Sequence, residues 1–283
     1  MEIIKTFDPA RIRALAVDLD GTVLLPDTTM SERMVRALSA CIARDIQVII
    51  CTGRAPEAVE KYRKPLGATG PMVYFNGAEV VDMPQGTVLS ATLLEKSVVE
   101  YCVELSRTMG VYYQVYFPGT PDKPHGFFMA ERNTEEAAMY FRHTGIQAVI
   151  GNISEALAAA PAGCIKGMFL SEPEIHDTLR QSVINRFGNR IYVARTLRTF
   201  LEVMDGRVSK GAGLRFAMKQ RGLCPQDVIA FGDEENDLPL FSESAYSVAP
   251  ANAKEQVCKS ADLVVASNAE DGVAAFLESA FQL

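Results

Sequence analysis

Three short runs of mostly apolar residues, each followed at once by polar residues, most constrain what this chain can fold into. They occupy residues 14–19, 48–51 and 228–231. Strands with apolar side chains on both faces are typical of parallel sheets that helices cover on both sides. Helical stripes between the runs, such as Met34, Leu38 and Cys41, supply candidate covering helices. We therefore expect an α/β fold with a Rossmann-like, doubly wound parallel sheet core.

The segment between the second and third apolar runs has a different hydrophobic pattern. Between about residues 84 and 198, alternating or aromatic strands such as 111–117 mix with helical stripes. One helix start is predicted at residues 171–174, Ser-Glu-Pro-Glu, a capping box with Pro in the first turn. A chain of 283 residues is long enough for two compact units. We expect a discontinuous core domain at residues 1–83 and 199–283, and an inserted, smaller α+β cap domain at residues 84–198.

Composition and charge exclude several classes of function. The formal net charge of −7 and the lack of a Lys/Arg cluster argue against nucleic-acid binding. No apolar run approaches the ~18 residues that span a bilayer, and the N-terminus lacks a basic region followed by an apolar stretch, so we expect neither a membrane protein nor a secreted one. The six cysteines form no Cys-x-x-Cys pair and are interpreted as reduced residues of a cytoplasmic protein. Monomer and dimer are both open.

Two carboxylates, Asp18 and Asp20, lie at the end of the first apolar run. An extended chain would point both side chains to the same side. Like charges this close need a cation between them or a retained proton, which suits a nucleophile paired with an acid. On their own, the two residues are explained about as well by an ordinary acidic turn.

Three further groups follow predicted strands or begin predicted helices. Thr52 and Gly53 offer a hydroxyl and backbone N–H groups to a phosphate oxygen. Lys210 lies in the first turn of a predicted helix, where a cation opposes the macrodipole, so phosphate binding would explain it. Residues 232–237, Gly-Asp-Glu-Glu-Asn-Asp, offer oxygen ligands of the kind that Mg²⁺ prefers. Each has a plain alternative: a turn, a surface lysine and a solvated acidic loop. Their shared position at carboxyl ends of strands favours one phosphate and metal site.

Together these residues resemble the motifs of the haloacid dehalogenase superfamily of phosphatases. They are Asp18-x-Asp20-Gly21-Thr22, Thr52-Gly53-Arg54, Lys210, and Gly232-Asp233-x-x-Asn236-Asp237. The Asn76-Gly77 pair and the run at residues 208–211 make the Cof-like branch the closer match, over essentially the whole chain. The long gap between the second and third motifs is where that branch carries its cap. Two departures are Cys51 and the Pro250-Ala251 pair before Asn252.

The resemblance implies a function and a set of roles. The chain would be a Mg²⁺-dependent phosphomonoester hydrolase acting on a small phosphorylated metabolite, such as a sugar phosphate, pyridoxal phosphate or flavin mononucleotide. The catalytic residues would be Asp18 as nucleophile and Asp20 as acid and then base. The phosphate-binding residues would be Thr52, Gly53, Lys210 and Asn236. The metal would be held by Asp18, the backbone carbonyl of Asp20, Asp233 and Asp237. Thr22 is treated as a turn residue, and Arg54 as either structural or facing the cap.

Two alternatives stay open at this point. A phosphomutase similar to phosphomannomutases would use the same phospho-aspartate chemistry, and a catalytically silent binding module would share the fold. Substrate choice should come from the cap. The aromatic and histidine candidates there are Tyr112, Tyr113, Tyr116, His125 and Phe127. Packing of a small sheet is the favoured interpretation for most of them.

Overall fold

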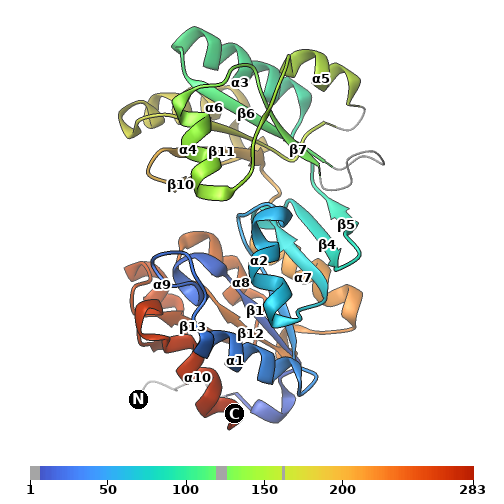
Figure 1. Ribbon diagram of the computed structural model, residues 1–283, viewed down its shortest axis with the longest axis vertical. Helices are drawn as coiled ribbons and strands as arrows, with labels where there is room; N and C mark the ends of the chain where they lie inside the picture. The colour runs from blue at the N-terminus through green and yellow to red at the C-terminus, as the bar shows by residue number, and fades with distance from the viewer. Residues whose placement is uncertain (1–6, 119–125, 161–162) are drawn as a thin grey trace. The chain divides into compact units, whose positions relative to one another are not determined.

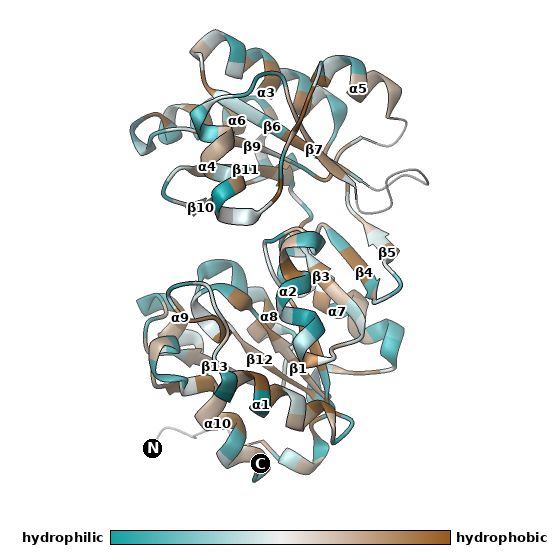
Figure 2. Ribbon diagram, in the orientation of Figure 1, coloured by the Kyte–Doolittle hydropathy of each residue, from teal (hydrophilic) through white to brown (hydrophobic). Residues whose placement is uncertain are grey.

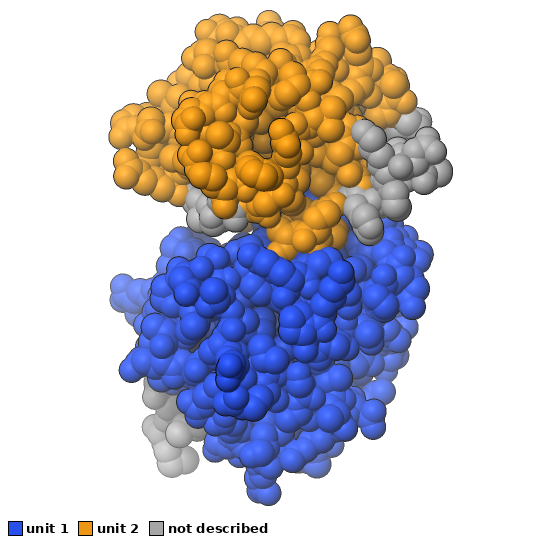
Figure 3. Space-filling model, in the orientation of Figure 1, with its two compact units in different colours: residues 1–54, 59–90, 209–283 blue, residues 55–58, 91–208 orange. Residues whose placement is uncertain are grey.

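The computed structural model describes residues 7–118, 126–160 and 163–283, which form two compact units (Figures 1 and 3). Unit 1 comprises residues 1–54, 59–90 and 209–283, and unit 2 comprises residues 55–58 and 91–208. The predicted limits at 83/84 and 198/199 separate a catalytic core from a cap. That functional division stays a prediction.

Unit 1 is built on a parallel sheet, as predicted. Within the described residues its strands are β1 (Ala14–Val17), β2 (Gln47–Ile50), β12 (Val228–Phe231), β13 (Tyr246–Pro250) and β14 (Leu263–Val265), in the order β14-β13-β12-β1-β2. Every neighbouring pair is parallel. In chain order, β2 is added to one edge of β1, and β12 is added later to the opposite edge of β1. The order of the sheet therefore reverses between β1 and β12, which is where open α/β sheets bind ligands.

Helices cover both faces of this sheet. They are α1 (Glu32–Ile42), α7 (Lys210–Arg221), α8 (Leu238–Ser242), α9 (Glu255–Ser260) and α10 (Gly272–Phe281). A further helix, α2 (Pro56–Leu66), follows β2, and its first residues belong to unit 2. Ala14, Ala16 and Ala230 face the core formed with α7 and α8, which contribute Leu214 and Leu240. On the other face the Phe231 ring meets the Phe276 ring of α10 at 5.8 Å. In Figure 2 the central strands carry mostly hydrophobic colours, as buried parallel strands should.

A smaller sheet extends unit 1 beyond β2. It contains β3 (Gly70–Tyr74), β4 (Glu79–Met83) and β5 (Thr87–Ala91). A parallel bridge between Cys51 and Val73 joins β3 to the end of β2, and β3 pairs antiparallel with β4. The end of β3 thus lies beside the end of β2, at the same edge of the unit.

Unit 2 contains an antiparallel sheet with one parallel edge pair. In the described part of the chain its strands are β6 (Tyr112–Phe117), β7 (Phe127–Ala130), β8 (Val149–Ile150), β9 (Lys166–Leu170), β10 (Ile191–Leu197) and β11 (Phe200–Asp205), in the order β10-β11-β9-β6-β7-β8. Its helices are α3 (Lys96–Met109), α4 (Glu135–Thr144), α5 (Ile153–Ala159) and α6 (His176–Phe187). Side chains from α3, α5 and α6 pack on one face of the sheet around Phe169 and Val183. The predicted α/β core with an additional α+β unit is confirmed.

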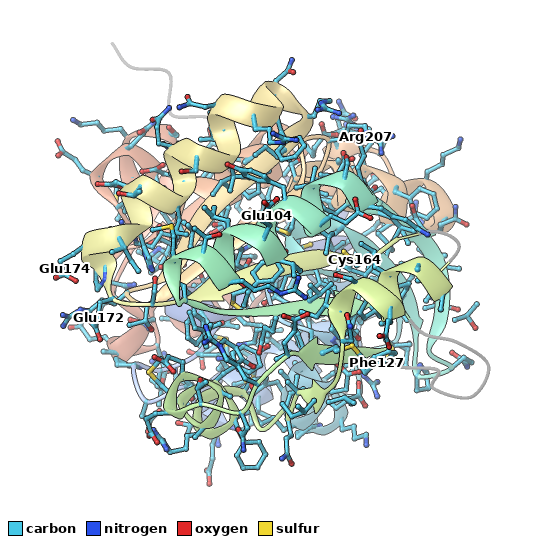
Figure 4. All side chains as sticks on the ribbon, turned by 90° about the horizontal axis from the view of Figure 1, so that it is seen from above. Glu104, Phe127, Cys164, Glu172, Glu174 and Arg207 are labelled. Atoms are coloured by element: carbon cyan, nitrogen blue, oxygen red, sulfur yellow. The ribbon has the colours of Figure 1, made fainter. Side chains whose placement is uncertain are left out.

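One predicted helix start is wrong in its detail. The helix stripe through Leu179 and Val183 lies on α6, but Ser171 does not cap it, because its hydroxyl donates to the carbonyl of Glu172. The chain first makes a 3₁₀ turn at Pro173–Ile175 and only then begins α6. Figure 4 shows Glu172 and Glu174 of this entrance at the margin of the unit, where solvent can hydrate them. By contrast, Ser209 caps α7 by accepting a hydrogen bond from the backbone N–H of Ala212.

The remaining short helices connect these elements. They are the 3₁₀ turns Pro9–Arg11, Phe75–Gly77, Gly188–Arg190, Pro225–Asp227, Glu235–Asp237 and Asn268–Glu270, and a π-type turn at Leu19–Val23. The first apolar run therefore ends its strand at Val17, two residues earlier than its composition indicates.

Candidate active site

The carboxyl ends of β1 and β12 carry the acidic residues of the site. Asp18 follows β1 directly, and its backbone N–H donates to the carbonyl of Phe231 at 3.1 Å. Asp233 follows β12 after Gly232, and the turn Glu235–Asp237 comes next. The reversal of the sheet between β1 and β12 thus brings the first and last sequence motifs together.

Lys210 is buried between two of these carboxylates. Its ammonium Nζ lies 2.7 Å from Asp18 Oδ1 and 2.6 Å from Asp237 Oδ1. The side chains of all three residues are at most 7% exposed. The structure therefore excludes the alternative of an exposed surface lysine, because a desolvated ammonium has to be paired.

Asp237 also organises the loop that follows β12. Its Oδ2 accepts hydrogen bonds from the backbone N–H groups of Asp233 and Glu234, both at 3.0 Å. The loop packs so closely that a Cβ on Gly232 would lie 2.3 Å from the Cβ of Asp237. A side chain at position 232 would push this carboxylate away from Lys210.

Thr22 fixes the orientation of Asp233. Its hydroxyl donates to Asp233 Oδ1 at 2.9 Å. The preceding residue, Gly21, has φ +74, and a Cβ on it would lie 2.1 Å from Asp233 Oδ2. Only glycine allows this approach, so the turn after β1 positions a carboxylate of the turn after β12.

The charges of the site oppose one another. Burial and the neighbouring Asp237 raise the pKa of Asp18 well above its usual value, although Lys210 counteracts them. Burial and Asp237 likewise raise the pKa of Asp233, to about 7. Burial alone would lower the pKa of Lys210, but Asp18 and Asp237 raise it above its usual value. The single ammonium does not neutralise three buried carboxyl groups.

These groups fit a divalent cation. Asp18, Asp233 and Asp237 each offer a carboxylate oxygen, and these oxygens lie within 4.8 Å of one another. Oxygen donors with excess negative charge are the set that hard cations such as Mg²⁺ prefer. The carboxylate of Asp20 is not part of this set, which leaves its backbone carbonyl as the ligand expected from sequence.

The raised pKa of Asp233 predicts an unusual pH dependence of stability. An unfolded Asp releases its proton near pH 4, whereas folded, metal-free Asp233 keeps it until about pH 7. The folded state therefore holds more protons between these values, and its free energy of unfolding falls as pH rises through this window. In EDTA at pH 8, Asp233→Asn should raise Tm above that of the wild type. The difference should shrink as pH falls and disappear at about pH 4 and below, where the unfolded Asp also keeps its proton.

Mg²⁺ supplies the second half of this comparison. At pH 8 it should raise the Tm of the wild type and leave Asp233→Asn almost unchanged, because metal binding needs the ionised carboxylate. Thermal unfolding followed by circular dichroism measures both proteins under all three conditions. A lower Tm for Asp233→Asn in EDTA at pH 8 would contradict the electrostatic account.

Asp20 lies in a different environment from Asp18. Its side chain is about half exposed and accepts two hydrogen bonds from Arg54, Nε to Oδ2 at 2.7 Å and Nη2 to Oδ1 at 2.5 Å. The cause is the π-type turn that begins at Leu19, since the chain leaves the extended conformation after Asp18. Asp18 and Asp20 are thus separated into a buried and an accessible carboxylate.

Thr52, Gly53 and Asn236 meet around Asn76. The Thr52 hydroxyl accepts from the N–H of Arg54 at 3.2 Å, and its carbonyl accepts from the N–H of Asn76 at 2.9 Å. Asn236 Nδ2 donates to Asn76 Oδ1 at 2.9 Å, and a Cβ on Gly53 would lie 3.1 Å from the same oxygen. No described contact joins these groups to Lys210, so their phosphate-binding roles stay predictions.

Two asparagines, Asn76 and Asn252, also shape this site. The sequence predicts Asn76 only as part of a turn, but the residue is buried with φ +56 and connects the turns after β2 and β12. Its position after a strand at the same edge was a usable signal. Asn252 donates to the carbonyl of Gly21 at 2.8 Å and accepts from the N–H of Asn268 at 2.9 Å. Nothing near Asn252 in the sequence indicates this contact.

The aromatic candidates of unit 2 pack against their neighbours. The Tyr113 ring lies 4.6 Å from Phe169, and the Tyr116 ring 4.7 Å from Phe128. Phe127 stacks on Phe117 at 5.3 Å. The Tyr112 hydroxyl donates to Gln114 Oε1 at 3.0 Å. His125 lies outside the described residues.

Comparison with known proteins decides the family. The sequence matches a model of haloacid dehalogenase-like hydrolases over residues 15–277. The chain belongs to the haloacid dehalogenase-like hydrolases. The resemblance predicted from the motifs, including the Cof-like branch, is confirmed. This haloacid dehalogenase-like protein is an enzyme, a hydrolase of phosphoric monoesters.

Three similar proteins illustrate the range of this family. The 5-amino-6-(5-phospho-D-ribitylamino)uracil phosphatase YitU of Bacillus subtilis is 28% identical over 279 residues, covering 95% of this chain and 97% of YitU. The pyridoxal phosphate phosphatase YbhA of Escherichia coli is 26% identical and covers 94% and 98%. A haloacid dehalogenase-like hydrolase from Bacteroides thetaiotaomicron has the same fold, with a TM-score of 0.84, 22% identity and coverage of 95% and 99%. Among the described residues of our hydrolase, no helix combines the length and apolar character needed to cross a membrane.

Proposed function

We propose that this hydrolase is a Mg²⁺-dependent phosphatase that transfers a phosphoryl group to Asp18 and then to water. The observation that carries the proposal is the buried cluster of Lys210 between Asp18 and Asp237, beside Asp233, at the reversal point of the sheet. A nucleophilic carboxylate needs a counter-charge close by, and Lys210 supplies one 2.7 Å from Asp18 Oδ1. Asp20, whose side chain is half exposed, can act on a leaving group or on water.

The reaction would proceed in two halves. An oxygen of Asp18 attacks phosphorus, the bond to the leaving oxygen breaks, and Asp20 gives that oxygen a proton. Asp20 then takes a proton from water, whose oxygen attacks phosphorus and returns the electron pair to Asp18. Inorganic phosphate and an alcohol are the products.

The remaining residues would bind and orient the phosphoryl group. Thr52, the Gly53 N–H and Asn236 are proposed to hold its oxygens, while Lys210 offsets the charge that develops in the transition state. Asp18, the carbonyl of Asp20, Asp233 and Asp237 would hold Mg²⁺, which when bound reduces the repulsion between carboxylate and phosphate.

The substrate is proposed to be a small phosphorylated metabolite. The relatives YitU and YbhA are named for a ribitylaminouracil phosphate and for pyridoxal phosphate. We propose that residues 84–198 act as the cap that selects the leaving group. The cysteines of the described chain are unpaired and four of the six are buried, which suits a reducing compartment such as the cytoplasm.

A phosphate-release screen tests this function. The purified enzyme with Mg²⁺ should release phosphate from at least one member of a panel that contains the two named substrate types, sugar phosphates and flavin mononucleotide. EDTA should abolish the release, and added Mg²⁺ should restore it. Full activity in EDTA would remove the metal from the mechanism. An isomerised hexose phosphate without phosphate release would instead show a phosphomutase.

A further inference from the structure

The ion pair between Arg54 and Asp20 is the feature of unit 1 that the roles above leave unexplained. The guanidinium binds both carboxylate oxygens through Nε and Nη2, at 2.7 and 2.5 Å. Such a two-point contact fixes the plane of a carboxylate, which a single hydrogen bond does not. The Arg54 side chain is 11% exposed, whereas that of Asp20 is 50% exposed. A shielded arginine thus holds an accessible acid.

Arg54 is itself fixed by contacts that do not involve Asp20. Its backbone N–H donates to the Thr52 hydroxyl, and its carbonyl accepts from the N–H of Phe75 at 3.2 Å. Its guanidinium lies over the Tyr62 ring, 5.5 Å from the centroid. The Tyr62 hydroxyl in turn donates to the carbonyl of Thr28 at 2.7 Å. These contacts constrain the backbone and the guanidinium of Arg54 independently of Asp20.

We propose that Arg54 is a positioning residue that holds the carboxyl group of Asp20 for proton transfer. This inference rests on the proposed function, because it assigns Arg54 a part in the steps of Asp20. When Asp20 gives its proton to the leaving oxygen, it becomes a carboxylate beside the guanidinium. The attraction between them is strongest as that charge develops, so Arg54 assists the transition state more than the ground state.

The leaving oxygen determines how much this assistance matters. Esters whose leaving group is already a stable anion need little proton donation, whereas esters of weak acids depend on it. Loss of Arg54 should therefore penalise poor leaving groups selectively. A merely structural arginine would affect all esters alike.

The proposal is tested by measuring kcat/KM with three aryl phosphates of similar shape: phenyl, p-nitrophenyl and 2,4-dinitrophenyl phosphate. The stability of the leaving anion increases in that order. This ratio reports the steps up to departure of the leaving group. Arg54→Gln should lose about 10²-fold with phenyl phosphate and less than about 3-fold with the dinitrophenyl ester. Arg54→Lys keeps the charge but not the two-point contact, and should lose about 10-fold with phenyl phosphate only.

A matched control removes a similar pair away from the site. Arg33 also binds a carboxylate at two points, with Nε and Nη2 at 3.0 and 2.6 Å from Glu278. Arg33→Gln should leave all three kcat/KM values within about 2-fold, since an exposed pair contributes little.

The outcomes separate this inference from the proposed function. Equal losses with all three esters, or no loss with phenyl phosphate in either Arg54 variant, would overturn the positioning role and leave the phosphatase in place. If Arg54→Gln does not fold, Arg54→Lys alone decides by the same comparison. A wild type that hydrolyses neither the aryl esters nor any metabolite of the panel would instead overturn the proposed function.

Discussion

Replacing Asp18 by asparagine should abolish steady phosphate release, with a loss of at least about 10⁴-fold in kcat. The amide has nearly the same shape as the carboxylate, so its oxygen can still accept a hydrogen bond from Lys210. It is not a nucleophile toward phosphorus, however, and the first half of the reaction stops. Release of phosphate from p-nitrophenyl phosphate under saturating Mg²⁺ measures the effect.

Asp45→Asn is a suitable control for this variant. Asp45 is exposed and follows the end of α1, outside the proposed site. Its φ is +61, a conformation that asparagine also adopts, so the replacement should leave kcat within about 2-fold of the wild type. Activity of Asp18→Asn within 10-fold of this control would contradict the assignment of Asp18 as nucleophile.

Lys210→Met should reduce both activity and stability. It leaves Asp18 and Asp237 buried without their shared counter-charge, which costs about 3–5 kcal/mol when one partner of a buried pair is lost. The transition state also loses the cation that lies 2.7 Å from the proposed nucleophile, so kcat should fall by about 10²–10³-fold. Denaturant unfolding and initial rates, both measured well below Tm, give the two values.

Lys166→Met provides a matched control for burial. Lys166 pairs with Glu202 at 2.5 Å in unit 2, and both side chains are about 5% exposed or less. Breaking this pair should cost a similar free energy of unfolding but should change kcat for p-nitrophenyl phosphate far less. Equal losses of kcat in the two variants would indicate that Lys210 contributes only stability.

The convergence of the site could be predicted because parallel strands end at one edge. Asp18, Asp233 and Asp237 lie at or after apolar runs that are typical of buried parallel strands, and the structure brings their oxygens together. The burial of Lys210 could not be predicted from its position in α7. It depends on Asp237 returning from the turn after β12, a contact between residues far apart in the sequence.

The divergence of Asp18 and Asp20 could not be predicted for a related reason. Alternation along a strand assumes that the strand continues, but the chain leaves the extended conformation at Leu19 and Gly21 adopts φ +74. The side chain of Asp20 is instead bound by the guanidinium of Arg54. The sequence shows that Arg54 is present but does not predict that its side chain contacts Asp20.

Local signals succeeded where no distant contact competed with them. Lys210 lies in the first turn of α7, as predicted, and Ser209 caps this helix. Ser171 also stands at a predicted helix start, but a 3₁₀ turn begins at Pro173 instead. The Ser171 hydroxyl donates to the carbonyl of Glu172 and caps no helix. The domain limits at 83/84 and 198/199 stay predictions. The compact units divide after residues 90 and 208, and residues 55–58 also belong to unit 2.

The most direct test of the central claim is to trap the phosphorylated enzyme. Wild-type protein mixed with p-nitrophenyl phosphate and Mg²⁺, quenched in acid within the first turnover and mapped by peptide mass spectrometry, should carry one phosphoryl group on Asp18. The same treatment of Asp18→Asn should give no phosphorylated peptide. Phosphate release from the wild type without an adduct, or with an adduct on another residue, would contradict transfer through Asp18.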